Sequence, residues 1–194
     1  LSQEMIRLAN YMELYCQILF FPEQRRREFE QLPSAIRDLS ETCEEYMYRI
    51  RISADDERMR ESYATVSYSM LAFRRMARIL SGDLRRMAEE GTMALFRREV
   101  GEETWEALTR LAHTNIRLAL RAFALGDADS ASDTSRYERE FDELDRKIRA
   151  RLGTEALNRR ELSPLIEFLS QVYSLVKTSL EVARGEAYRT VARN

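Results

Sequence analysis

The sequence is poor in the residues that form turns. It contains 6 glycines and 3 prolines among 194 residues, less than half of the average usage of about 7% and about 5%. So few turn residues exclude β-sandwiches, β-barrels, collagen and glycine-rich linkers. Leucine also outnumbers valine and isoleucine together, and unbranched side chains lose little rotamer freedom in a helix. The composition therefore predicts an all-α fold.

Cysteine and histidine are also scarce. Cys16 and Cys43 are the only cysteines, which is too few for a disulfide framework, and a reducing cytoplasm is the expected location. With His113 as the only histidine, the usual zinc and ferritin-like di-iron ligand sets are excluded. His113 is interpreted as a polar residue beside an apolar helix face. The sequence also lacks a nucleophile elbow, a phosphate-binding glycine loop and a dinucleotide fingerprint, so no enzyme activity and no cofactor are expected.

A charge excess of one sign and long apolar runs are missing as well. The 31 basic and 33 acidic residues leave a net charge of -2, which argues against nucleic-acid binding. The longest apolar run, residues 18–21, is far shorter than the roughly 20 residues that span a bilayer, and no signal peptide opens the chain. The chain begins at Leu1 rather than at methionine, which suggests either a shortened chain or a domain of a longer protein.

Apolar residues recur at spacings of three and four along six segments, as expected of amphipathic helices. The first helix covers residues 1–21, and the second runs from Pro33 to Ile50. A third opens near residues 53–57 and runs toward Gly82 or Gly91. After a connection that ends at Gly101, the fourth helix stops at residues 126–127. A polar loop over residues 127–135 precedes the fifth helix, which stops at Gly153, and Ser163-Pro164 opens the sixth.

The apolar positions of the first three helices match those of the last three at an offset of about 103 to 105 residues. Examples are Met12 with Ile116, Ile36 with Phe141, and Val66 with Leu169. The pattern predicts a duplicated three-helix unit: a first repeat over residues 1–91, a connection over 92–101 and a second repeat over 102–194. The six long helices would pack as two antiparallel bundles or as one elongated body. A fortuitous match between similar helices is the alternative.

Two sets of charged residues are candidates for binding. Glu138, Asp142 and Asp145 share one edge of the predicted fifth helix and could hold a hard cation together; the alternative is a solvated face paired with arginines. Arginines form clusters that suit an anionic partner or a lipid headgroup, although glutamates lie among most of them. The clusters are residues 25–27 with Arg37, and the pairs 74–75, 85–86, 97–98 and 159–160.

Two neighbouring segments resemble a known family. The first, Leu-Ala-Leu-Arg-Ala-Phe-Ala-Leu-Gly-Asp over residues 118–127, precedes a helix with Glu-Arg-Glu-Phe-Asp-Glu-Leu over residues 138–144. Both segments, and the duplicated six-helix pattern across the whole chain, resemble PhoU-like domains. Members of this family often carry Glu-x-x-x-Asp motifs in the third helix of each repeat, which can hold metal clusters. Here residues 169–174 read Leu-Ser-Gln-Val-Tyr-Ser, a departure that fits a transporter-fused branch.

The resemblance implies a non-enzymatic regulator of phosphate uptake that acts through protein contacts. Its partner would be a membrane phosphate transporter or its own transmembrane domain, as in sodium-phosphate cotransporters. The expected location is the cytoplasm, at the inner face of the membrane, and a homodimer is a further option. An unrelated helical interaction or dimerisation module, and a metal-binding regulator of the PhoU type, remain as alternatives.

Overall fold

The computed structural model describes residues 2–21, 30–50, 57–125, 128–154 and 159–193, and these segments are almost entirely helical. This confirms the predicted all-α class. The helices are α1 (Ser2–Phe20), α2 (Leu32–Arg49), α3 (Glu57–Arg78), a π-helical turn η3 (Ile79–Leu84), α4 (Arg85–Glu89), α5 (Thr92–Val100), α6 (Glu102–Leu125), α7 (Ala128–Thr154) and α8 (Arg159–Arg193).

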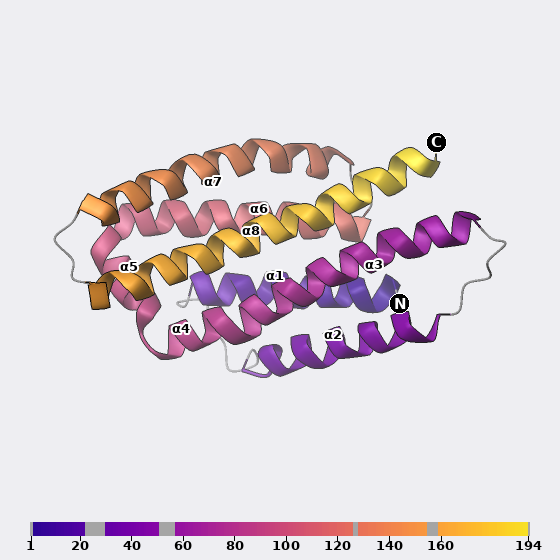
Figure 1. Ribbon diagram of the computed structural model, residues 1–194, viewed down its shortest axis with the longest axis horizontal. Coiled ribbons are helices and arrows are strands. Elements are labelled where there is room, and N and C mark those ends of the chain that lie inside the picture. Colours follow the sequence, from indigo (N-terminus) through magenta and orange to yellow (C-terminus); the bar gives the residue numbers. More distant parts are fainter. Residues whose placement is uncertain (1, 22–29, 51–56, 126–127, 155–158, 194) are drawn as a thin grey trace.

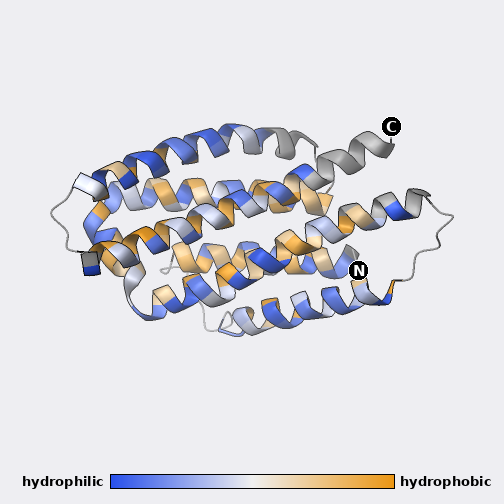
Figure 2. Cartoon of the chain, viewed as in Figure 1, coloured by the Kyte–Doolittle hydropathy of each residue, from blue (hydrophilic) through white to orange (hydrophobic). Residues whose placement is uncertain are grey.

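The long helices lie side by side in an elongated body (Figure 1). Helices α1, α2 and α3 pack against one another, as do α6, α7 and α8, while α1 contacts α6 and α3 contacts α8. One continuous core joins them, as the edge-to-face pair of Phe73 on α3 and Phe123 on α6 shows, with ring centroids 4.9 Å apart. The two predicted repeats therefore share their main core. Apolar residues gather in the central helices, and α2 and α7 are more hydrophilic (Figure 2).

The predicted connection over residues 92–101 contains a helix, α5. Its apolar residues Met93, Phe96 and Val100 are buried, and the Phe96 ring lies 4.7 Å from that of Phe168 on α8. Arg151 of α7 donates a hydrogen bond of 2.8 Å to the carbonyl oxygen of Val100. A cation at this position satisfies the unpaired carbonyl groups at a helix end. The segment is too short for the spacing of its apolar residues to predict a helix, and tertiary packing stabilises the helix that it forms.

The third predicted helix does not end at Gly82. It continues through η3 and α4 to Glu89, and the chain turns at Gly91, which has a φ of 80°. Gly91 is thus the stop, because a left-handed backbone favours glycine at helix ends. Gly82 lies inside the π-helical turn. Of the two stops that the sequence offered for this helix, the chain therefore uses Gly91 and not Gly82.

Two helix starts also differ from the predictions. Helix α7 begins at Ala128, so most of the expected loop over residues 127–135 is helical, with Thr134 buried against the rest of the bundle. Helix α8 begins at Arg159, which places Pro164 inside the helix rather than at its first position. Proline removes one backbone donor, and near the start of a 35-residue helix the remaining hydrogen bonds and the buried apolar face outweigh that loss. Within the described segments, no helix is long and apolar enough to cross a membrane.

Candidate functional site

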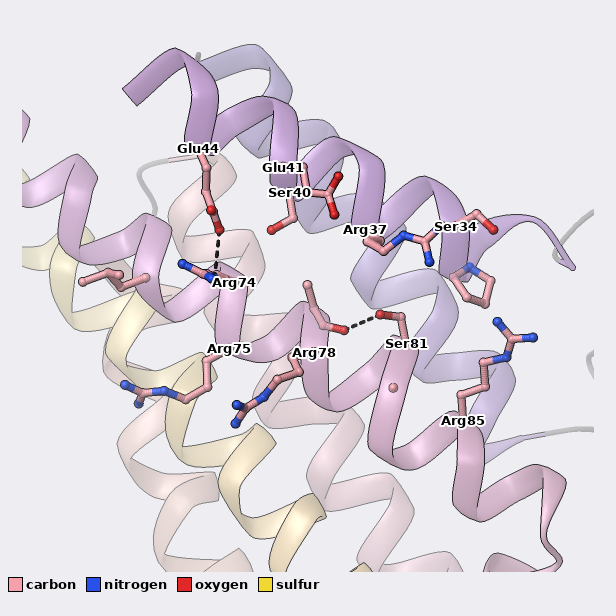
Figure 3. A pocket seen from close by; sticks show the side chains of 14 residues that line it. Ser34, Arg37, Ser40, Glu41, Glu44, Arg74, Arg75, Arg78, Ser81 and Arg85 are labelled. Carbon is pink, nitrogen blue, oxygen red and sulfur yellow. Dashed lines mark hydrogen bonds and ion pairs between the residues drawn. The ribbon is translucent and has the colours of Figure 1, made fainter. Parts of the chain in front are cut away.

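A wide groove lies between α2 and the continuous helix α3–η3–α4. Its volume is about 690 Å³, and its lining is rich in arginine and serine (Figure 3). The arginines are Arg37 from α2, Arg74, Arg75 and Arg78 from α3, and Arg85 from α4. The carboxylates that line it are Glu41 and Glu44. Positive charge therefore exceeds negative charge in the groove.

Helical spacing explains why these side chains share one space. On α2, Ser34, Arg37, Glu41 and Glu44 recur every three or four residues beside the buried stripe that contains Ile36 and Cys43. Residues three and four apart lie on one face of a helix. The same spacing relates the α3–α4 residues on the opposite wall. The groove is thus the seam where two polar helix faces meet above a shared apolar core.

Several groove arginines already have carboxylate partners. Arg74 Nε lies 3.1 Å from Glu44 Oε1 across the groove, and Arg75 Nη1 lies 3.3 Å from Glu181 Oε1 on α8. Arg85 pairs with Glu89 at 2.8 Å on its own helix. Among the described carboxylates, Arg37 pairs only with its neighbour Asp38, at 3.5 Å. Arg78 makes no hydrogen bond or ion pair with another described residue. All five guanidinium groups are substantially exposed, so these pairs contribute about 1 kcal/mol or less each.

An apolar pocket of about 180 Å³ continues the groove along the same two helices. Glu44, Leu71 and Arg74 line both cavities, and Tyr48 and Tyr63 line the apolar one. Among the described residues, most of the large apolar side chains that remain exposed lie on α2, at its C-terminal end or on α3. They are Tyr46, Tyr48, Ile50, Tyr68 and Leu71, and only Leu125 lies elsewhere. We call this set the α2–α3 apolar surface.

The three predicted metal ligands lie on α7, and cationic side chains occupy their surroundings. Lys177 Nζ on α8 lies 2.8 Å from Glu138 Oε1 and 2.8 Å from Asp142 Oδ2. Asp145 is buried and accepts a hydrogen bond of 2.8 Å from Arg149 Nε. In the described part of the chain, no three acidic, histidine or cysteine side chains are grouped as metal ligands would be. The ammonium of Lys177 thus bridges two carboxylates where a bound cation would have to sit, and the metal site stays a prediction.

Burial tends to lower the pKa of Lys177, but its hydrogen bonds to Asp142 and Glu138 outweigh this effect and raise the pKa above its ordinary value. Lys177 is therefore charged at neutral pH. Its ammonium also lies 5.2 Å from the centre of the Tyr173 ring, and Arg184 Nη2 lies 3.1 Å from Glu138 Oε2. The cluster therefore connects α7 to α8 by charge.

His113 is half-buried beside Phe21, with the two ring centroids 5.8 Å apart and the rings edge to face. Burial, followed by the nearby charge of Arg117, lowers the pKa of His113. The prediction that it flanks the apolar face of its helix agrees with this position. Cys16 and Cys43 are buried free thiols, and burial raises the pKa of both, which leaves them unreactive.

The structure separates the predicted arginine clusters. Arg37, the pair 74–75 and Arg85 meet in the groove. Arg86 faces away and pairs with Glu90 and Glu167, while Arg97 pairs with Glu102. The run 25–27 lies outside the described residues, as does the side chain of Arg159. Sequence patterns missed Ser40, Arg78 and the α2–α3 apolar surface.

Comparison of the chain with protein-family models, with curated proteins and with solved structures found no match.

Proposed function

We propose that this chain is a non-enzymatic regulatory domain that controls phosphate uptake by contacting a membrane phosphate transporter from its cytoplasmic side. The observation that carries the contact function is the α2–α3 apolar surface, where Tyr48 is 84% exposed and Leu71 is 60% exposed. Tyrosine and arginine are enriched at protein interfaces, and a concentration of exposed apolar side chains marks interaction sites. The link to phosphate comes from the resemblance of residues 118–127 and 138–144 to PhoU-like domains.

The proposal includes a duplicated architecture, with α1–α3 as one three-helix unit and α6–α8 as the other. In support, each set is consecutive in sequence and its members pack together. The regulatory step would be a shift between two packings of these units that differ in affinity for the transporter, because a partner can bias only states that it binds unequally. Superposition of the two units in a crystal structure, helix onto corresponding helix, tests the duplication.

The functional test measures uptake of radiolabelled phosphate by cells of the source organism that lack this chain and are complemented with variants. We expect Y48S/L71S to behave like the deletion, because it replaces two exposed apolar contacts with hydroxyl groups. The matched control is L125S, which alters an exposed leucine that is 67% accessible on α6; it should behave like the wild type. Unchanged phosphate uptake in the deletion strain would overturn the proposal.

Self-association is a second candidate for the same surface, because its tyrosines would also suit a contact between two copies of the chain. Analytical ultracentrifugation over a range of concentrations tests it. A dimer that Y48S/L71S abolishes and L125S preserves would assign the surface to a homodimer. A chain that stays monomeric would leave the surface to a different protein.

A further inference from the structure

The arginine-lined groove has the chemistry of an oxyanion site. Arg37 and Arg85 come from opposite walls, and Figure 3 shows both side chains directed into the space near Ser34. Arginine presents several N–H donors in a planar fork that matches the oxygen atoms of phosphate. The acidic partners of these two arginines are exposed residues on their own helices, Asp38 and Glu89. Such surface pairs are weak, so a phosphate group can compete with them for the guanidinium groups.

Ser40 adds a neutral hydrogen-bond donor to the groove. It lies one helical turn after Arg37, lines the groove and is only 5% exposed. Its hydroxyl forms no hydrogen bond with another described residue, and the hydroxyl oxygen itself is not fully buried, so it is accessible from the groove that it lines. By contrast, Ser81 on the opposite wall donates to the carbonyl oxygen of Ala77 at 2.7 Å, so its proton is already engaged. Ser40 is therefore an available neutral donor in the groove, as is the exposed Ser34, which also forms no hydrogen bond with another described residue.

The π-helical turn shapes this part of the groove. Single π-helical turns within α-helices occur frequently at functional sites. Ser81 and Gly82 of this turn line the groove. A Cβ atom added at Gly82 would meet no atom within 4 Å. The missing side chain leaves space beside Arg85, which follows the turn directly. The volume of about 690 Å³ accommodates more than one phosphate group, so a phosphate ester fits as well as the free ion.

We propose that this groove binds a phosphate group, held by Arg37 and Arg85 from opposite helices, with the hydroxyl of Ser40 as an additional donor. Phosphate binding in this groove does not depend on whether the chain contacts a transporter. Of the two lining carboxylates, Glu44 is paired with Arg74. Glu41 has no cationic partner among the described residues and repels an anion. The substitution E41Q removes this negative charge and should therefore improve phosphate binding. If distant arginines attracted the anion nonspecifically, a change at this one position in the groove would have little effect.

The test titrates inorganic phosphate into the 194-residue chain at constant ionic strength, with chloride as the reference anion, and follows binding by calorimetry. A parallel arm measures cosedimentation with vesicles of phosphatidylglycerol and, as reference, of phosphatidylcholine.

The double variant R37Q/R85Q should weaken binding at least about tenfold, since two charge-assisted contacts are lost. The control R139Q/R146Q removes the same charge from exposed positions on α7 and should change binding less than about twofold. S40A should weaken binding, and E41Q should strengthen it severalfold.

The two arms separate the sources of the phosphate group. Saturable binding of the free ion assigns the groove to a small phosphate, and binding only to the anionic vesicles assigns it to a lipid headgroup. The proposal fails if neither probe binds better than its reference, or if R139Q/R146Q weakens binding as much as R37Q/R85Q does. E41Q keeps the test independent of folding, because unchanged or weaker binding by a variant with native circular dichroism would also overturn the proposal.

Discussion

Replacement of Lys177 by methionine should destabilise the contact between α7 and α8. Methionine keeps most of the apolar stem of lysine and removes the ammonium group that joins Glu138 to Asp142 at 2.8 Å each. Glu138 retains Arg184 at 3.1 Å. Asp142 loses the one cationic partner that it has among the described residues, and its Oδ1 atom is already buried without a hydrogen-bond partner. The cost of the substitution thus falls mainly on Asp142.

The magnitude follows from the partial burial of the cluster. The Lys177, Glu138 and Asp142 side chains are 27%, 17% and 35% exposed. Fully exposed pairs contribute about 0.2 to 1 kcal/mol, and loss of one partner of a buried pair costs about 3 to 5 kcal/mol. For this intermediate case we expect K177M to lower the free energy of unfolding by about 1.5 to 3 kcal/mol. With a typical slope of unfolding free energy against urea concentration, this loss lowers the urea concentration at the unfolding midpoint by about 1 M.

Urea denaturation at pH 7, followed by circular dichroism, measures this effect. K147M is the matched control, because Lys147 is the other lysine of the chain and is exposed on α7; it should change stability by less than about 0.5 kcal/mol. D142N combined with K177M should cost less than the sum of the two single changes. Because folding raises the pKa of Lys177, its contribution is complete below about pH 10.4 and is lost as the pH rises through the folded-state value. Equal stability of K177M and K147M, or strict additivity with D142N, would refute the reasoning.

Three further predictions concern packing, backbone and pH. F73A should lower the free energy of unfolding by about 3 to 5 kcal/mol, because Phe73 is fully buried against Phe123, whereas L71A at an exposed site should cost far less; denaturant titration of both variants checks this. G82A should raise the melting temperature, since the added methyl group meets open space in a helical backbone, and G91A should lower it, because its φ of 80° disfavours alanine; calorimetry that ranks the two variants in the reverse order would contradict the argument. Because folding lowers the pKa of His113, the wild type should lose stability as the pH falls below about 6.5, and H113Q should lose less; parallel acid titration curves of the two proteins would show that His113 does not contribute.

Periodicity predicted most of the long helices because each buries a continuous apolar stripe. It placed the ends of α1, α2 and α6 within a few residues of their positions, since Pro22, Pro33 and Gly101 stand at breaks in the apolar pattern of the sequence. It failed for α5, which has only 9 residues and depends on the packing of Phe96 against Phe168. The predicted helix stop at Gly82 was wrong for a related reason. A glycine signals a helix stop only where the backbone turns left-handed, and the sequence does not reveal that conformation.

The candidate site was predicted less well than the fold. Arginine clusters were visible in the sequence, but nothing in it showed that Arg37 would face Arg85 across a groove while Arg86 turned toward Glu167. Spacing placed Glu138 and Asp142 on one helix edge, and their actual partner, Lys177, lies on the next helix, 35 residues after Asp142.

The sequence by itself determined the class of the fold, because few turn residues and apolar stripes at helical spacing allow a chain to bury its core only as packed helices. It also determined which face of each long helix is buried. Only the tertiary structure decided which helices are neighbours, and hence which polar faces meet at the seam between α2 and α3–α4. Charge pairing and cavity shape depend on distances between separate helices, and a periodicity within one helix carries no information about those distances.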